Sequence, residues 1–144
     1  MKIPIASDHA GYPAKEIIKK LLEEMGHTPV DFGTNSEEAV DYPDYSHEVS
    51  KRVRDGEFQT GILVCGSGQG VCMTANKYEG IRAALVYNEL VAERSRQHND
   101  ANVLCLPGRE LDASQLAAIL KAWLDTPFEG GRHERRVAKI HKQP

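Results

Sequence analysis

The sequence has little of what marks membrane, secreted or nucleic-acid-binding proteins. Its apolar runs are far shorter than the roughly 20 residues that cross a bilayer, and Asp8 and His9 interrupt the N-terminal stretch before it reaches signal-peptide length. Only three cysteines occur, without the spacing of a zinc site or a disulfide framework. The net charge of -3 gives no general attraction for nucleic acid or an acidic membrane. We therefore expect a cytoplasmic protein whose cysteines are thiols.

Repeats, low-complexity segments and linkers rich in glycine or serine are also missing from the chain. Its 144 residues, 40% of them hydrophobic and 27% charged, suit one globular unit that can bury a core. We expect a single domain over residues 1–144.

What the sequence does contain is an alternation of short apolar runs with amphipathic stretches. Five apolar runs of four to six residues are interpreted as strands: residues 2–6, 28–32, 61–65, 83–87 and 102–106. Such an alternation is typical of βα units around a parallel sheet. The predicted fold class is α/β, a three-layer α/β/α arrangement with a five-stranded parallel sheet, Rossmann-like and doubly wound.

Helices are expected between the strands. The clearest one begins near Pro13, and its apolar residues recur at helical spacing: Ala14, Ile17, Ile18, Leu21, Leu22 and Met25. Another begins around Asp112, which can form a capping box with Gln115, and ends before Pro127. Further helices are predicted near residue 71, over residues 89–97 and from residue 132 onward.

Polar residues follow four of the predicted strands. They lie in the segments 7–11, 33 with 41–43, 65–70 and 107–109. Because ligands of open parallel sheets bind beyond the carboxyl ends of the strands, we expect these four loops to converge on one rim.

The loop CGSGQG, which begins at Cys65, has a glycine at every second position between a buried strand and a helix. Such a loop can direct backbone N–H groups at an anion. A dinucleotide fingerprint would need a glycine where Val71 stands, and a Walker loop would need a lysine that is missing. A phosphatase loop of the cysteine type would, by resemblance, need an arginine at position 71. A tight strand-to-helix turn remains an alternative interpretation.

Cys65 lies beside these N–H groups, which favour its thiolate form, and a thiolate can act as a base. If the N–H groups of residues 66–70 face a substrate oxygen that gains charge, the loop is an oxyanion hole for an enediolate. The alternative is a buried, inert thiol, because free cysteine is often buried. We adopt that interpretation for Cys72 and Cys105.

Arginine and histidine supply further candidates. Arg132 and Arg136 share one face of the last predicted helix, where an anion such as phosphate would remove their conflict with the helix dipole. They could equally be solvated charges. His98, at a helix end, can titrate near neutral pH and suits an acid or base, although such histidines are more often caps or surface residues. His9 follows Asp8 on the expected rim. The other histidines are expected at the surface or at helix ends: His27, His47, His133 and His141.

Together these segments closely resemble the ribose-5-phosphate isomerase B family, the group that also contains the galactose-6-phosphate and allose-6-phosphate isomerases. The resemblance runs nearly end to end, through SDHAG from Ser7, DYPDY from Asp41, CGSGQG from Cys65, ANK from Ala75, GIRA from Gly80, SRQHNDANV from Ser95 and EGGRH from Glu129. Agreement at so many separated places is not expected by chance.

The resemblance implies an aldose–ketose isomerase that interconverts ribose 5-phosphate and ribulose 5-phosphate. It implies that Cys65 moves the proton from C2 to C1 through a cis-enediolate held by the backbone of residues 66–70. Ser67 stands where the family has threonine or serine. One branch of the family uses a glutamate further along the loop, but residues 71–75 contain no carboxylate, which favours Cys65.

The resemblance also assigns roles to other residues. The implied catalytic residues are Cys65, Ser67 and His98, with His98 opening the sugar ring. The implied substrate-binding residues are Gly66, Gly68, Gln69 and Gly70 in the loop, Asp8, Tyr42 and Asn99 at the sugar hydroxyls, and His9, Arg109, Arg132 and Arg136 at the phosphate.

No metal or organic cofactor is implied, and the sequence shows no cluster of metal ligands. The family forms homodimers, in some cases paired into tetramers, with active sites shared between subunits. Two alternatives stay open: the same reaction on a hexose 6-phosphate, and a nucleotide- or flavin-binding regulator without chemistry. Neither nucleic acid nor a membrane is an expected partner.

Overall fold

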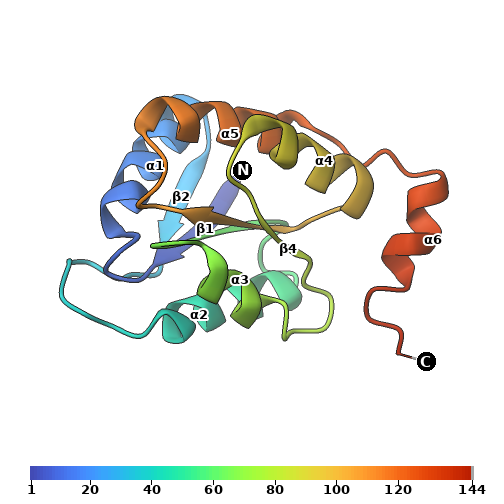
Figure 1. Cartoon of the computed structure of the whole chain (residues 1–144), viewed down its shortest axis with the longest axis horizontal. Coiled ribbons are helices and arrows are strands. Elements are labelled where there is room, and N and C mark those ends of the chain that lie inside the picture. The colour runs from blue at the N-terminus through green and yellow to red at the C-terminus, as the bar shows by residue number, and fades with distance from the viewer. Residues whose placement is uncertain (144) are drawn as a thin grey trace.

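Five parallel strands form the centre of the molecule, and helices cover both faces of their sheet (Figure 1). The structure is a computed structural model that describes residues 1–143. The strands are β1 (Lys2–Ser7), β2 (Thr28–Asp31), β3 (Gly61–Cys65), β4 (Ala83–Leu85) and β5 (Val103–Pro107), in the order β2-β1-β3-β5-β4. All their pairings are parallel. The predicted fold class is confirmed, and each strand lies within two residues of its predicted bounds.

Alternate residues of the strands face opposite helical layers. Ile62 and Val64 of β3 face the core shared with α1 (Tyr12–Glu24), α4 (Glu89–Asn99) and α5 (Ala113–Asp125). Leu63 and Cys65 face the core shared with α2 (Tyr42–Arg54) and α3 (Gln69–Ala75). Figure 1 shows the first three helices above the sheet and the other two below it. Because both faces are covered, β3 and β5 are continuous buried runs without polar alternation.

The first helix differs from its predicted apolar stripe at two positions. Ile17 is 37% exposed, whereas the charged residue Lys15 is fully buried. The Lys15 ammonium donates hydrogen bonds of 2.6 Å to a carboxylate oxygen of Asp31 and to the carbonyl oxygen of Thr34. These partners make burial of the charge tolerable, and they tie α1 to β2 and to the loop that follows it.

The sequence analysis missed α2. Its buried face consists of Ser46, Val49, Ser50 and Val53, so only two of the four buried positions are apolar. The Ser46 hydroxyl donates to the carbonyl oxygen of Val71 at 2.8 Å, which satisfies a buried polar group and joins α2 to α3. A hydrophobic pattern cannot reveal a helix face built in this way.

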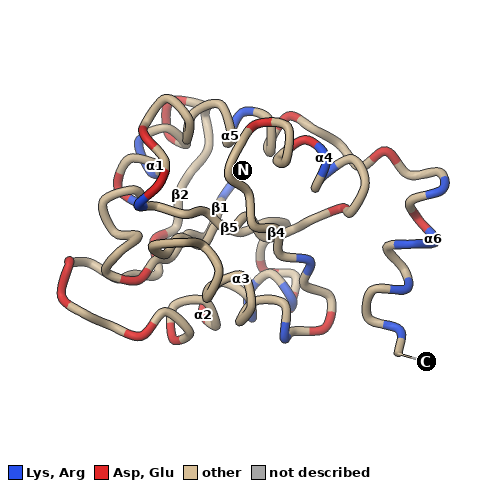
Figure 2. The backbone as a smooth tube through the Cα atoms, in the orientation of Figure 1, with Lys and Arg blue, Asp and Glu red and all other residues tan. Residues whose placement is uncertain are grey.

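The last helix, α6 (Arg132–Ala138), stands off the body with α4 as its neighbour (Figure 1). It begins where the sequence predicted, but Ile140 lies beyond its end and is 51% exposed. The apolar face expected from Val137 and Ile140 therefore covers little within this chain. Figure 2 shows the positions of Lys and Arg spaced along the backbone of this segment. Over residues 1–143, every helix is too short or too polar to cross a membrane.

Candidate active site

A cavity of about 440 Å³ opens at the carboxyl ends of β1, β3 and β5. Its lining consists of Asp8, His9, Ala10, Tyr42, Cys65, Gly66, Ser67, Gly70, Arg109 and Glu110. The predicted convergence of four loops on one rim is confirmed, with the second loop represented by Tyr42 at the start of α2. Sequence reasoning did not single out Ala10 and Glu110, which carry no signal beyond their position next to predicted site residues.

Cys65 is the last residue of β3 and lies between the apolar core and the cavity. Only 4% of its surface is exposed, and it packs with the α2 and α3 core, but it also lines the cavity. Cys65 therefore belongs both to this core and to the wall of the cavity. Cys105 is fully buried on the same side of the sheet, and burial raises the pKa of its thiol. That environment agrees with the expected inert role of Cys105.

Two glycines of the loop after Cys65 are required by packing. Gly68 has a positive φ of 74°, and a Cβ atom there would lie 2.5 Å from Cδ1 of Leu85. A Cβ atom on Gly70 would lie 2.5 Å from the ring of Tyr42. Within residues 1–143, the N–H groups of Gly66, Ser67 and Gly68 donate no hydrogen bond to the protein. The loop thus combines a compact turn with backbone donors that remain available to a ligand.

Asp8 and His9 are held in place by backbone groups. A carboxylate oxygen of Asp8, which is 6% exposed, accepts the N–H of Gly11 at 2.9 Å. The Nδ1 atom of His9 accepts the N–H of Val40 at 3.1 Å. In the neutral imidazole the proton must then lie on Nε2, which makes that atom a hydrogen-bond donor. The loop before α2 therefore fixes the tautomer of a histidine on the cavity wall.

Arg109 supplies a cation beside the glycine loop. Its Cδ atom lies 3.5 Å from the position that a Cβ atom would take on Gly66. The backbone N–H of Arg109 donates to the carbonyl oxygen of Gly66 at 3.3 Å. The N–H of Gly108 donates to the carbonyl oxygen of Cys65 at 2.8 Å, so the loop after β5 is tied to the loop after β3. Arg109 is thus the one arginine or lysine among the described residues that line the cavity, beside the carboxylates of Asp8 and Glu110.

Six predicted site residues do not line this cavity. Gly68 and Gln69 belong to the loop after Cys65, and the other four lie elsewhere in the chain. His98 and Asn99 end α4, and Arg132 and Arg136 lie on α6. None of them lines the cavity that contains Cys65, and both arginines are exposed. Asn99 instead borders a second cavity, between β4 and the C-terminal segment. A single chain thus brings together the Cys65 half of the predicted site and leaves the His98 half separate.

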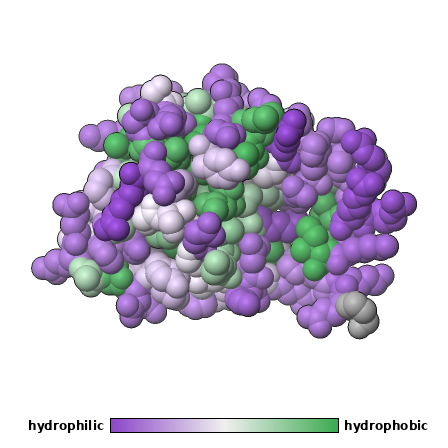
Figure 3. Space-filling view, in the orientation of Figure 1, coloured by the Kyte–Doolittle hydropathy of each residue, from purple (hydrophilic) through white to green (hydrophobic). Residues whose placement is uncertain are grey.

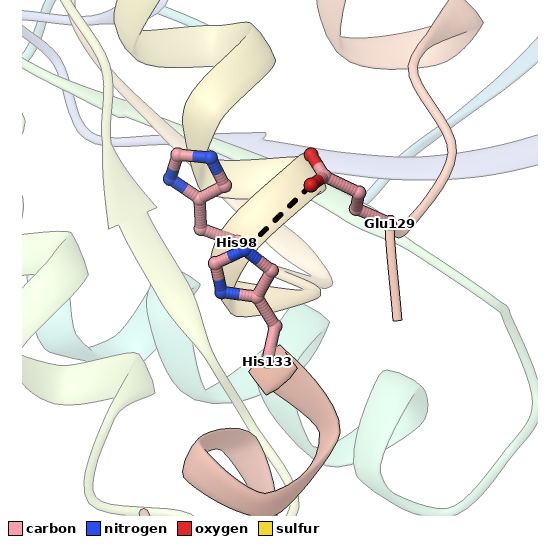
Figure 4. Close-up of side chains that lie close together, drawn as sticks. All are labelled: His98, Glu129 and His133. Carbon is pink, nitrogen blue, oxygen red and sulfur yellow. Dashed lines mark ion pairs between the residues drawn. The ribbon is translucent and has the colours of Figure 1, made fainter. Parts of the chain in front are cut away.

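The His98 half contains a cluster that the sequence did not reveal. Potential ligand atoms of His98, Glu129 and His133 all lie within 4.8 Å of one another (Figure 4). The rings of His98 and His133 are stacked, with centroids 4.5 Å apart. His133 lies at a helix end, as expected, but it is not at the surface: it is 5% exposed, and its ring packs on that of His98 at the end of α4. Burial lowers the pKa of His133, and the neighbouring Arg132 and His98 lower it further.

The fold and the rim together define a class: a doubly wound α/β protein with a polar cavity at the carboxyl edge of its sheet. The particular family follows from comparison with known proteins. The chain belongs to the ribose/galactose isomerase family, whose model matches residues 3–140.

Individual relatives agree in sequence and in structure. The chain is 43% identical to the ribose-5-phosphate isomerase B of Escherichia coli, covering 96% of this chain and 93% of that protein. A ribose 5-phosphate isomerase from Thermotoga maritima superposes with a TM-score of 0.96 at 48% identity, covering 99% and 98% of the two chains. The ribose-5-phosphate isomerase B of Mycoplasma genitalium, solved with bound ribulose-5-phosphate, has a TM-score of 0.91 at 45% identity, with 96% and 93% covered.

Proposed function

We propose that the protein interconverts ribose 5-phosphate and ribulose 5-phosphate, as one domain and without metal or organic cofactor. The observation that carries the proposal is that Cys65 lines one cavity together with Asp8, His9 and Arg109. The related isomerase from Mycoplasma genitalium, solved with ribulose-5-phosphate, supports this substrate. A cytoplasmic location belongs to the same proposal, because a charged sugar phosphate does not cross a membrane unaided.

The reaction moves two hydrogens. The thiolate of Cys65 takes the proton from C2 of the aldose. The electron pair of that C–H bond forms the C1=C2 bond of an enediolate, while the π pair of the C1=O bond moves to O1. The proton is returned to C1, while the hydroxyl proton passes from O2 to O1. The charge on the oxygens is stabilised by the free N–H groups of residues 66–68. Since the Ser67 hydroxyl accepts the N–H of Gln69 at 3.3 Å, its own proton is available for a substrate oxygen.

Binding would use the remaining wall of the cavity. Asp8 and Tyr42 are suited to the sugar hydroxyls, since a carboxylate accepts hydrogen bonds and a phenol can donate or accept them. Arg109 and the Nε2–H of His9 are suited to the phosphate, because charge-assisted hydrogen bonds to phosphate oxygens are strong. The assignment of all four residues rests on the cavity lining, and that of His9 rests also on its tautomer.

The site as a whole would need a second subunit. We assign His98, Asn99, Arg132 and Arg136 to the active site of a neighbouring copy of the chain in a homodimer, with pairing of dimers into a tetramer as a further possibility. Three large apolar side chains support an interface, since Met73, Tyr87 and Leu90 are at least half exposed. Figure 3 shows apolar areas on the body and at the inner edge of the C-terminal segment. The positively charged α6 stands off the body and is free to contact another copy.

Exchange of Cys65 tests the mechanism. In Cys65→Ala, kcat/KM should fall by about 10² to 10⁴ in both directions, since the base for carbon is lost. His98→Asn should impair conversion of ribose 5-phosphate, which is mostly a closed ring, and spare conversion of ribulose 5-phosphate, which cannot form that ring. Cys72→Ala is the matched control for loss of a thiol. Normal turnover in Cys65→Ala would contradict the assignment.

A substrate panel tests the choice of sugar. Turnover of ribose 5-phosphate should exceed that of allose 6-phosphate and galactose 6-phosphate, as the names of the similar proteins suggest. Preference for either hexose would move the protein to another activity of the same family. Tight nucleotide binding without any isomerisation would reject an enzymatic role.

A further inference from the structure

The cluster of His98, Glu129 and His133 has the composition of a metal site. Two imidazoles and one carboxylate are a common ligand set for Zn²⁺ and related divalent ions, whereas Mg²⁺ and Ca²⁺ prefer oxygen ligands. The three side chains come from the end of α4, the loop before α6 and the first turn of α6 (Figure 4). The N–H of Glu129 donates to the carbonyl oxygen of Gln97 at 3.0 Å, which anchors this loop to α4 beside His98.

A second observation points to a ligand at the same place. The Nε2 atom of His133 is buried and has no hydrogen-bond partner among the described residues. Its nearest acidic neighbour is an oxygen of Glu129, 3.9 Å away, which is too far for a hydrogen bond. Buried polar atoms without partners are uncommon in folded proteins. A bound cation at this point would give both the nitrogen and the carboxylate a partner.

We propose that His98, Glu129 and His133 form a binding site for one Zn²⁺ ion or a similar divalent transition-metal ion per chain. Tetrahedral bonds of roughly 2.0 to 2.1 Å place donor atoms about 3.4 Å apart. The donors here lie within 4.8 Å, so they must approach by up to about 1.4 Å, and the ring of His98 must turn out of the stack. Glu129 is exposed and His98 half-buried, so both side chains have room to move, while His133 is fixed.

Two neighbouring charges, those of Arg132 and Arg136, oppose the ion, and both side chains are exposed. The guanidinium of Arg132 lies 3.9 Å from Glu129, but its side chain is 64% exposed and can turn into solvent. The proposed ion is an inhibitor rather than a cofactor, and this consequence rests on the proposed function of His98. A nitrogen bonded to Zn²⁺ cannot exchange a proton with the oxygen of the sugar ring. Conversion of ribose 5-phosphate should therefore be inhibited more strongly than conversion of ribulose 5-phosphate.

Metal binding is tested first without substrate. Equilibrium dialysis of the full chain against Zn²⁺ should give one ion per chain, and Co²⁺ should bind with a spectrum that lacks sulfur-to-cobalt charge transfer. Glu129→Gln and His133→Asn should each weaken Zn²⁺ binding at least tenfold, because even indirect partners of metal ligands cost about 10- to 100-fold. His141→Asn, on the same C-terminal segment, is the matched control and should bind normally.

The Zn²⁺ affinities of the variants can contradict the proposal. Unchanged Zn²⁺ affinity in Glu129→Gln, or loss of binding in Cys65→Ala or Cys72→Ala instead, would overturn it. Glu129→Gln exchanges an exposed side chain, so circular dichroism should show an intact fold. Because binding is measured without substrate, a failure of the isomerase assay leaves this test unaffected, and a failure of metal binding leaves the isomerase proposal unaffected.

Discussion

At the scale of the residue, two cysteines show how position along a strand determines chemistry. Cys65 and Cys105 face the same core, on neighbouring strands. In the register of these strands Cys105 lies opposite Leu63, so Cys65 is two residues nearer the carboxyl edge. Two residues of strand span about 6.6 Å. That distance separates a thiol at a cavity from a thiol sealed in the core.

Arginines of α6 give a prediction at this scale. Under the proposed dimer, Arg132→Ala or Arg136→Ala should raise KM for ribose 5-phosphate with little change in kcat. Each loses charge-assisted hydrogen bonds of about 1.5 to 3 kcal/mol, which corresponds to about 10- to 150-fold in KM. Arg54→Ala is the control. Arg54 pairs with Asp55 at the C-terminal end of α2, whereas the cavity is lined by Tyr42 at the N-terminal end of that helix. Steady-state kinetics with an unchanged KM would remove the α6 arginines from the phosphate site.

The candidate site was predictable where it follows strands. Asp8, Cys65 and Arg109 lie at or just beyond the carboxyl ends of three strands. Because the sheet is parallel, these strand ends share one edge. Glu129 and His133 gave no such signal. They reach His98 only because the chain returns to α4 after the whole of α5, and no local pattern encodes that return.

At the scale of the element, a charged contact joins α1 to β2. Burial alone raises the pKa of the Asp31 carboxyl, but hydrogen bonds from Lys15, Lys19 and the N–H of Gly33 outweigh it. The pKa of Asp31 therefore lies below its usual value of 3.8. A carboxyl whose pKa is lowered by folding stabilises the fold at pH values above its pKa in the unfolded chain. That stabilisation is lost as the pH falls through its pKa in the folded chain.

This contact predicts a pH dependence of stability. Asp31→Asn should be less stable than the unchanged protein at pH 7, and the difference should persist down to about 3.8, the usual pKa of the group. Below that pH the difference should shrink, because the carboxylate is progressively protonated. Denaturant titrations between pH 7 and pH 2.5 measure it, with the exposed Glu37→Gln as control. A difference that stays constant to pH 2.5 would refute the role of the charge.

Elements were predictable to the extent that their buried faces are apolar. β3, β5 and α5 bury nearly continuous apolar sets, and α5 also carries the capping box of Asp112 and Gln115 that the sequence indicated. α2 buries Ser46 and Ser50. The hydroxyl of Ser46 finds its hydrogen-bond partner in α3, which the local sequence does not reveal. Lys15 is similar, since its burial depends on Asp31 and on the backbone of Thr34.

At the scale of the whole molecule, each chain contains the two halves of the proposed site on separate surfaces. In a dimer with shared sites, one half from each copy would build each active site. The arrangement can therefore be tested by combining inactive chains, because a symmetric dimer contains two equivalent sites.

Mixed dimers of Cys65→Ala and His98→Asn chains, isolated with two different tags, should regain activity on ribose 5-phosphate. One site of each mixed dimer would carry both substitutions and the other none, so about half of the normal activity is expected. Mixed dimers of Cys65→Ala and Asp8→Asn are the matched control, since both residues line the same cavity. These should stay inactive. Recovery in the control, or none in the first pair, would show that the sites are not shared in this way.

The strand order also affects how the protein is made. β4 pairs with β5, which follows it in the chain, and β3 lies between β1 and β5. A nascent chain of which only residues 1–100 have left the ribosome therefore has β2, β1 and β3 in place, but one edge of β3 is open. Open strand edges invite aggregation. Synthesis must reach the last third of the protein before the strand that carries Cys65 gains its second neighbour, so the open edge of β3 persists until β5 has been made.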